Sequence, residues 1–243
     1  MIKTLCIRTM KCSKRNIWPI LNIESKTFCA KSSHSDCHDK DIRIKVLEGS
    51  MKHVEDCGWS ELALAMGAKD IGLPSITHTI FSRGAVELVE YYIDQKRIAV
   101  WNHVHSMKDI SEMSDNDKLH ILMEKHLDYL IPYISNWSSA LALLADPSLD
   151  QIPYSTENAI KLSDDFCKIS NLKLSKFDWY LERSALLTIY CSSELYMLSD
   201  TSEHYRDTKD FLRNNLNLYY SSKHNSTLKT AVKVVKDTFF KSM

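Results

Sequence analysis

The residues near the N-terminus that are best suited to chemistry are Cys29, His34, Cys37 and His38. Thiolate and imidazole groups are the ligands that zinc prefers in proteins. Their spacing fits no standard zinc site, however. The seven cysteines of the chain are odd in number and include no Cys-x-x-Cys pair, so they do not predict a disulfide framework either. We therefore expect no metal at this cluster. We also expect the protein to reside in a reducing compartment.

Histidines also occur in pairs within two later segments. His103 and His105 are two residues apart, so their side chains would diverge on a helix and could not share a metal ion. His120, Glu124 and His126 lack the Glu-x-x-His pairs from which a di-iron helical bundle is built. The chain also contains no GxSxG, P-loop, GxGxxG or HExxH motif. The sequence thus predicts a protein with no catalytic activity, metal or cofactor, and a soluble enzyme is a weaker alternative.

Aromatic side chains at the start of a predicted helix indicate the recognition of a partner. Phe177, Trp179 and Tyr180 cluster there, and such a trio often belongs to a core. Trp179 and Tyr180 are adjacent, so they would point about 100° apart on a helix and at least one should lie near the surface. Exposed Trp and Tyr are common anchors of protein interfaces. Arg183 would share a helix face with Tyr180, and its simplest role is a surface ion pair.

Two apolar helix faces could form either the core or a ligand cavity, and the sequence does not separate the two. The first comprises Leu186, Leu187, Tyr190, Leu195, Met197 and Leu198, and the second comprises Ile134, Trp137, Leu141 and Leu144. Residues spaced three and four apart fall on one side of a helix and predict burial of that side.

A basic amphipathic helix is predicted at the C-terminus. Its apolar face contains Leu228, Ala231, Val232, Val235 and Phe239, and Lys229, Lys233, Lys236 and Lys241 lie largely on the remaining surface. A helix of this kind after a polar spacer is typical of contact with a membrane surface, which anionic lipids would strengthen. The alternative is a terminal helix that docks on its own domain.

The elements that must position these residues are all predicted to be helices. All five glycines lie between Gly49 and Gly84, and the last proline is Pro153. Sheet proteins and α/β enzymes need many Gly and Pro turns, so the chain is expected to be all-α, with about nine to ten helices. The expected helices cover about 40–57, 60–71, 75–81, 85–105, 117–130, 133–145, 156–170, 175–199, 203–220 and 227–241. Ser60 is expected to be the N-cap of the second helix, and Gly58, Gly72 and Gly84 are expected to separate the first four.

The first 39 residues are expected to be a mitochondrial targeting leader. Five basic residues and no acid precede Glu24, and Ser, Thr and Cys are frequent. An acid-poor, basic and hydroxyl-rich N-terminus is typical of such a leader. A disordered basic tail is the alternative. The longer apolar stretch 129–145 is too short and too polar for a transmembrane helix.

Residues 44–92 resemble the helix-turn-helix start of TetR-family regulators. The order is a helix, a glycine stop, a short helix, the segment AKDIGLP, a second short helix and then a long helix. A recognition helix needs side chains for base edges and phosphates, but the second short helix reads SITHTIF and has neither Lys nor Arg. Together with a net charge of zero, this predicts a vestigial motif that no longer binds nucleic acid.

Three longer motifs make the resemblance more specific. They read CGWSELALAMGAKDIGLP, FSRGAVELVEYY and FDWYLERSALLTIYCSSELYMLSDTSEHYRDTKDFL. Together they resemble the TetR-fold coenzyme Q (ubiquinone) biosynthesis family, the ninth of that pathway's numbered components, from about residue 41 to about residue 220. The resemblance implies a mitochondrial, non-catalytic lipid-binding protein. Such a protein presents quinone intermediates to the di-iron demethoxyubiquinone hydroxylase.

The resemblance also implies roles for particular residues. Trp179 and Tyr180 would contact the hydroxylase, together with Asp164, Asp165 and Phe166, for which the alternative is a solvated acidic turn with one buried phenylalanine. The family often has methionine where this chain has Phe166. Arg183 would bind a lipid headgroup, where a guanidinium suits phosphate. Glu182 stands where the family often has a second arginine, which reduces the local positive charge.

The expected organisation follows from these assignments. Residues 1–39 form the leader, 40–105 the helix-turn-helix-like part, 106–220 the domain that binds lipid and partner, and 221–243 the polar spacer and membrane-contact helix. The lipid-binding residues would include Arg183, Leu186, Leu187 and Tyr190. The expected location is the matrix side of the inner mitochondrial membrane, with the coenzyme Q synthesis complex as partner and a homodimer as an open possibility. A TetR-type transcription regulator is the competing hypothesis, and a quinone-modifying enzyme is a third, weaker one.

Overall fold

The computed structural model describes residues 34–110, 112–146, 152–171 and 176–224, and these residues form helices and connecting turns without a β-strand. The all-helical fold expected from the sequence is confirmed. The α-helices are α1 (His34–Ser50), α2 (Val54–Cys57), α3 (Glu61–Asp70), α4 (Val86–His105), α5 (Asp115–Asp128), α6 (Ile134–Ala145), α7 (Ile152–Ile169), α8 (Lys176–Met197) and α9 (Arg206–His224). The short 3-10 helices are Met51–His53, Ser75–Ile80, Ile131–Tyr133 and Glu203–Tyr205.

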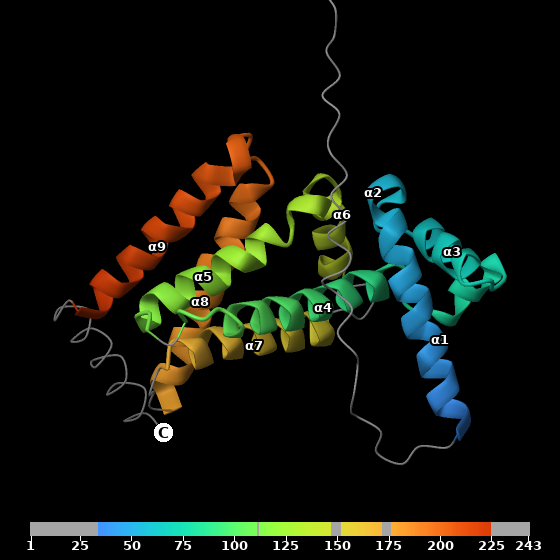
Figure 1. Ribbon diagram of the computed structural model, residues 1–243, viewed down its shortest axis with the longest axis horizontal. Helices are drawn as coiled ribbons and strands as arrows, with labels where there is room; N and C mark the ends of the chain where they lie inside the picture. Colours follow the sequence, from blue (N-terminus) through green and yellow to red (C-terminus); the bar gives the residue numbers. More distant parts are fainter. Residues whose placement is uncertain (1–33, 111, 147–151, 172–175, 225–243) are drawn as a thin grey trace, which may run out of the picture.

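The N-terminal helices α1, α2 and α3 form a small unit at one end of the molecule (Figure 1). Ser60 caps α3 as predicted, because its Oγ accepts a hydrogen bond from the Ala63 amide at 3.3 Å. Helices α1 and α3 approach so closely that a Cβ at Gly67 would lie 2.4 Å from the backbone nitrogen of Ser50. Glycine is therefore required at this crossing for steric reasons.

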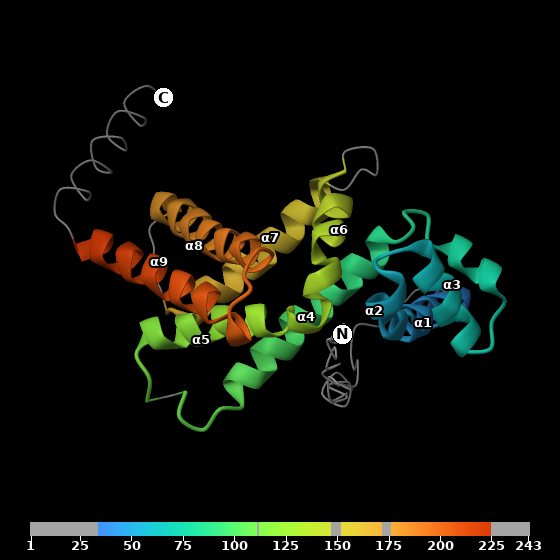
Figure 2. The same ribbon diagram turned by 90° about the horizontal axis from the view of Figure 1, so that it is seen from above.

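The long helix α4 runs from this unit into a larger bundle formed with α5 to α9 (Figure 2). An aromatic cluster of Trp59, Tyr92, Tyr133 and Trp137 joins the two parts, with ring centroids 4.9–5.7 Å apart. The Tyr92 hydroxyl donates a hydrogen bond to the Tyr129 carbonyl at the end of α5. These contacts make a core that continues from the small unit into the bundle.

In the bundle, α7 and α8 pack against each other and α9 lies along α8 and α5 (Figure 2). Lys209 on α9 forms ion pairs with Asp128 at 2.8 Å and with Glu124 at 3.3 Å on α5. Asp200 caps the start of α9, since its carboxylate accepts hydrogen bonds from the Thr208 amide at 2.9 Å and the Ser202 amide at 2.8 Å. Buried apolar side chains fill the space between these helices.

Several helix boundaries differ from those expected. Helix α1 begins at His34 rather than near residue 40. The segment Ser75–Ile80 is a 3-10 helix, because β-branched Ile and Thr are stiff and fill four of its six positions. Helix α7 already includes Pro153 in its first turn, where proline is tolerated.

The predicted polar spacer is also partly helical, since α9 continues to His224. No glycine or proline interrupts this segment, and the Ser222 hydroxyl donates to the Tyr219 carbonyl at 2.7 Å within the helix. The hydroxyl therefore has a hydrogen-bond partner inside the helix, and the chain does not have to turn to provide one. Among the described residues, no helix is both long and apolar enough to span a bilayer.

Candidate functional site

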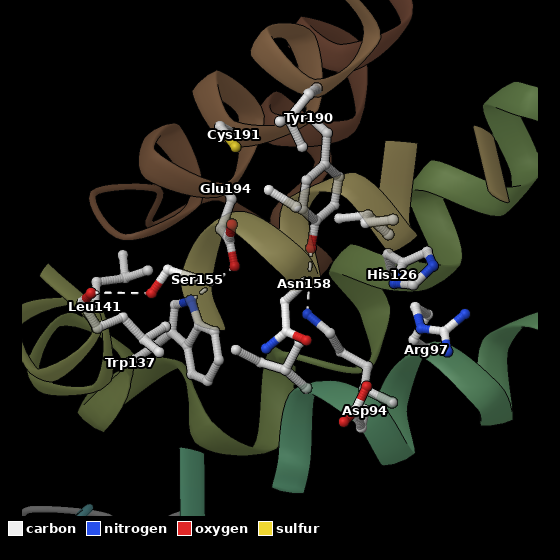
Figure 3. Close-up of a pocket in the computed structure, with 16 residues that line it drawn as sticks. Asp94, Arg97, His126, Trp137, Leu141, Ser155, Asn158, Tyr190, Cys191 and Glu194 are labelled. Atoms are coloured by element: carbon white, nitrogen blue, oxygen red, sulfur yellow. Dashed lines mark hydrogen bonds between the residues drawn. The ribbon is translucent and has the colours of Figure 1, made fainter. Parts of the chain in front are cut away.

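A cavity of about 170 Å³ lies among α4, α5, α6, α7 and α8, and Figure 3 shows the side chains that line it. The wall is mostly apolar and aromatic, with a few polar groups. The lining residues are Ile93, Asp94, Lys96, Arg97, His126, Trp137, Leu141, Leu144, Ser155, Asn158, Ala159, Leu162, Leu187, Tyr190, Cys191 and Glu194. An apolar pocket with a few converging polar groups is the usual form of a small-molecule site.

The polar part of the wall is a buried network between α4, α6 and α8. The Lys96 ammonium donates a hydrogen bond to the Tyr190 hydroxyl at 3.2 Å, and the Trp137 indole donates to Glu194 at 2.8 Å. Lys96 lies 5.4 Å from the centroid of the Trp137 ring, close enough for a cation–π contact. Figure 3 shows Tyr190 and Glu194 extending from α8 toward the other helices.

Burial changes the acidity of both charged groups in this network. Desolvation lowers the pKa of Lys96, although the negative charge of Glu194 opposes the change. Desolvation raises the pKa of Glu194, against the attraction of Lys96 and the hydrogen bond from Trp137. Both shifts arise because a charge in an apolar interior loses its hydration, and in each case the opposite charge of the partner offsets part of this loss.

His126 closes the cavity on the α5 side. Its ring is fully buried and packs edge-on against Phe166 and Tyr190, with centroids 5.9 Å away in each case. Desolvation and the nearby cations Lys96 and Arg97 hold its pKa well below the usual range, so the imidazole is neutral at physiological pH. No group of three potential metal ligands occurs in the described part of the chain.

The structure places the acidic residues of α7 differently from the partner surface expected of them. Asp165 is buried and forms an ion pair with Arg97 at 2.7 Å. The Phe166 side chain is fully buried, which agrees with the alternative of an acidic turn that carries one buried phenylalanine. Asp164 is partly exposed and forms an ion pair with Arg183 of α8. Of this trio, only Asp164 is accessible to a partner in this conformation.

Trp179 and Tyr180 are both exposed on α8, by 36% and 68% respectively. Their rings nevertheless touch edge to face, with centroids 4.6 Å apart, and Arg183 lies 3.5 Å above the Trp179 ring. At least one of these aromatic side chains was expected near the surface, and this is confirmed, since both are exposed. Arg183, whose side chain is 15% exposed, therefore has Asp164 and Trp179 as its partners.

The predicted lipid-binding residues are only partly brought together. Leu187 and Tyr190 line the cavity, whereas Leu186 is fully buried in the core and Arg183 is not among the lining residues. From the apolar face of α6, Trp137, Leu141 and Leu144 reach the cavity. The structure thus separates core from cavity where the sequence could not.

Two further sets of predicted residues lie outside the described residues. The predicted membrane-contact helix falls after residue 224. The cluster of Cys29, His34, Cys37 and His38 falls before residue 41, where no side chain is described. Both assignments stay predictions.

The sequence analysis missed Lys96 and Glu194, and it treated His126 only as a weak metal ligand. Each of these residues interrupts a buried apolar face: Lys96 lies between Tyr92 and Val100, and Glu194 between Tyr190 and Met197. An ionisable residue within the apolar spacing of a helix is the signal that could have found them, because such residues are seldom fully buried without a partner.

Two arginines next to the helix-turn-helix-like segment form ion pairs with carboxylates of α4. Arg83 pairs with Glu90 at 2.5 Å, and Arg43 pairs with Glu87. Hydrogen bonds to Glu90 are the largest influence on Arg83 and raise its pKa. The 3-10 helix Ser75–Ile80 contains neither Lys nor Arg.

The fold defines this chain as a helical protein of the TetR-like class. A crystal structure of the TetR transcriptional regulator from Nitrosomonas europaea superposes with a TM-score of 0.57 at 16% sequence identity, covering 73% of this chain and 97% of the regulator. At this identity, the similarity establishes the fold and nothing beyond it.

Within that class, the resemblance to the coenzyme Q biosynthesis family is confirmed. The COQ9 family model matches residues 152–221, which include α7, α8 and most of α9. The mitochondrial ubiquinone biosynthesis protein COQ9 of Drosophila melanogaster is 31% identical over 178 residues, covering 72% of this chain and 54% of that protein. Human mitochondrial COQ9 is 28% identical over 185 residues, covering 74% of this chain and 58% of the human protein.

A probable mitochondrial coq9 protein of Dictyostelium discoideum is also similar, with 29% identity over 210 residues, which is 84% of this chain and 68% of that protein. The chain thus spans a little over half the length of the fly and human relatives and two thirds of the amoebal one. The cavity-lining residues of α7 and α8 lie inside the segment that the family model matches.

Proposed function

We propose that this chain acts in ubiquinone biosynthesis as a non-catalytic lipid-handling protein of mitochondria. The observation that supports this role best is the apolar cavity among α4 to α8, part of whose wall lies in the segment similar to COQ9 proteins. The relatives are named as ubiquinone biosynthesis proteins and as mitochondrial. The protein would bind isoprenoid or phospholipid and present quinone intermediates to the di-iron demethoxyubiquinone hydroxylase at the inner membrane.

The cavity suits one end of such a lipid. Leu141, Leu144 and Leu187 supply apolar surface on α6 and α8, and Trp137 and Tyr190 supply aromatic surface. Burial of apolar ligand surface against such walls contributes about 25 cal/mol per Å². The volume is close to that of one ring-sized group, so the rest of a long lipid would extend out of the cavity.

Replacement of a single wall residue tests lipid binding. Leu187→Gln puts an amide into the apolar wall, so we expect less lipid to copurify, because the amide loses hydration without a bonding partner. Leu195→Gln is the matched control, since Leu195 is on the same helix but 59% exposed and not at the cavity. Native mass spectrometry with lipid extraction measures the bound lipid. Equal lipid in both variants and the unchanged protein would contradict a role for this cavity.

The proposed partner surface centres on Trp179 and Tyr180. Both are exposed at the start of α8, beside the Asp164–Arg183 ion pair. Aromatic and arginine side chains are the residue types that most often dominate binding energy at interfaces. The same face would meet the hydroxylase, and the wider coenzyme Q synthesis complex, at the matrix side of the inner membrane.

Membrane contact would come from the C-terminal amphipathic segment. Its predicted apolar side and its lysines Lys229, Lys233 and Lys236 would lie on an anionic membrane surface. Removal of residues 225–243 should reduce binding to vesicles that contain cardiolipin, measured by flotation. Unchanged flotation would exclude this segment as the membrane anchor.

The second candidate function is DNA binding, which the TetR-like fold alone would favour. The pairing of Arg43 and Arg83 with carboxylates of α4 argues against it, since a phosphate backbone requires cations that are available to it. A filter-binding assay at low salt distinguishes the two functions. Tight and salt-dependent binding of DNA would favour the regulator.

A further inference from the structure

Lys96 has fewer hydrogen-bond partners than a buried ammonium requires. Its side chain is 4% exposed and lines the cavity, and an ammonium group has three protons to donate. Among the described side chains, its hydrogen bond is to the Tyr190 hydroxyl at 3.2 Å, and the rings of Tyr92 and Trp137 lie with their centroids 6.0 and 5.4 Å from the ammonium. The unused donors therefore lie at the cavity wall, where an acceptor oxygen could reach them.

The cavity limits the size of the group that could supply this oxygen. Its volume of about 170 Å³ is close to the engineered protein cavity of about 150 Å³ that binds benzene. A six-membered ring with small substituents fits, whereas an entire phospholipid does not. The rings of Trp137 and Tyr190 in the wall also suit an aromatic or quinonoid ring, since offset and edge-to-face contacts between rings are favourable.

The charges around the cavity favour a neutral ligand over an anion. Two cations, Lys96 and Arg97, and two carboxylates, Asp94 and Glu194, line the wall. Arg97 is already paired with Asp165, a fifth charge behind the wall. A carboxylate or phosphate ligand would thus meet Glu194 and Asp94 as well as Lys96, and like charges in a low dielectric repel strongly.

We infer that Lys96 is the recognition residue for an oxygen-substituted ring, a phenol or quinone, donating a hydrogen bond to a ring oxygen inside the cavity. The inference rests on the proposed lipid-handling function and deepens it, because it assigns the cavity to the ring of the lipid rather than to its tail or to a phosphate. Tyr190 is a positioning residue that holds the ammonium through its hydroxyl, and Glu194 offsets the positive charge of Lys96.

Small soluble rings test this assignment on the full chain. The probes are 2-methoxyphenol, methylbenzene as a ring of similar size without oxygen, and benzoate as an anion, each titrated in ligand-observed NMR. Lys96→Met removes the donor and keeps the aliphatic stem. Lys108→Met is the matched control, since Lys108 is exposed just beyond α4. Methylbenzene binding reports whether a variant keeps the cavity.

We expect Lys96→Met to weaken 2-methoxyphenol about tenfold or more, as loss of a charge-assisted hydrogen bond does. Methylbenzene should change less than about twofold, and Lys108→Met should change neither. Equal losses for both rings, or an unchanged affinity for 2-methoxyphenol, would overturn the inference. So would benzoate binding more tightly than 2-methoxyphenol in the unchanged protein, or no ring binding at all.

Glu194→Gln supplies an independent test if Lys96→Met does not fold. The amide can still accept the hydrogen bond from Trp137 but carries no charge, so benzoate should bind about tenfold more tightly while 2-methoxyphenol changes little. Unchanged benzoate binding would refute the charge argument. Loss of ring recognition with copurifying lipid still present would leave the proposed function standing, whereas loss of both would remove it.

Discussion

The contact between α1 and α3 offers the sharpest test of the packing. Gly67→Ala would place a Cβ 2.2 Å from the Ser50 hydroxyl oxygen, 2.4 Å from the Ser50 nitrogen and 2.6 Å from its Cα. The hydroxyl could rotate away, but the two backbone atoms could not. Ordinary contact begins near 3.4 Å, so the helices would have to separate by about 1 Å.

The expected cost follows from that separation. Overpacking a core costs about 1–3 kcal/mol, and a clash with backbone belongs at the upper end. Alanine in place of glycine within a helix stabilises the helix by about 1 kcal/mol, which offsets part of this cost. The net loss in free energy of unfolding is therefore about 2 kcal/mol, or about 4–8 °C in Tm for a chain of this size. The side chains affected lie at the interface of the two helices, among them Val46, Leu47 and Leu64.

Thermal and urea unfolding, followed by circular dichroism, measure this loss. Gly72→Ala is the control, because a Cβ there meets no atom within 4 Å but the backbone has a φ of +80°. The free energy of unfolding of that variant should fall by only about 1–2 kcal/mol, which is the cost of an alanine in the left-handed conformation. The packing of the helices should not change. A Gly67→Ala protein as stable as the unchanged chain would refute the close crossing of α1 and α3.

Three further predictions concern the bundle. Arg97→Met removes the closer of the two cations paired with the buried Asp165 and leaves Lys168 at 3.6 Å, so it should lower the free energy of unfolding by about 2 kcal/mol, whereas equal stability in urea would show that the ion pair is replaceable. Burial opposes ionisation of Asp200, but hydrogen bonds from Thr208 and Ser202 outweigh it and lower its pKa to about 2, so its stabilisation is present above pH 4 and is lost as the pH falls toward 2. Asp200→Asn should flatten that acid dependence in urea titrations, and an unchanged slope would contradict the cap. Trp179→Lys should weaken binding to the hydroxylase in pull-downs without changing Tm. Unaltered binding would show that the interface does not include Trp179.

The local elements of the fold were largely determined by the sequence. Gly58 and Gly72 follow the ends of α2 and α3, and Gly84 lies in the turn before α4; each adopts a positive φ. The absence of glycine after Gly84 predicted the long helices of the bundle. Ser60 was identified as a cap because its hydroxyl competes for the first free amides of a helix. The motifs in α3, α4 and α8 were sufficient to indicate the family, since they combine residue identity with spacing.

Boundaries set by packing or backbone geometry were less predictable. The 3-10 form of Ser75–Ile80 and the extension of α9 to His224 depend on side-chain stiffness and on hydroxyls that bond within their own helix. For a related reason, the sequence did not decide whether Phe166 is buried. A residue beside two acids can face either solvent or core, and the choice depended on Arg97 reaching Asp165 from a different helix.

The sequence by itself determined the helical class, the helix stops and the exposure of an aromatic pair, because these depend on residues within a turn or two of one another. Only the tertiary structure decided which apolar residues line a cavity and which fill the core. It also brought Lys96, His126 and Glu194 from three helices into one wall. Each of these side chains is costly to bury alone, so its place is determined by partners that are distant in the sequence and meet only when the bundle is packed.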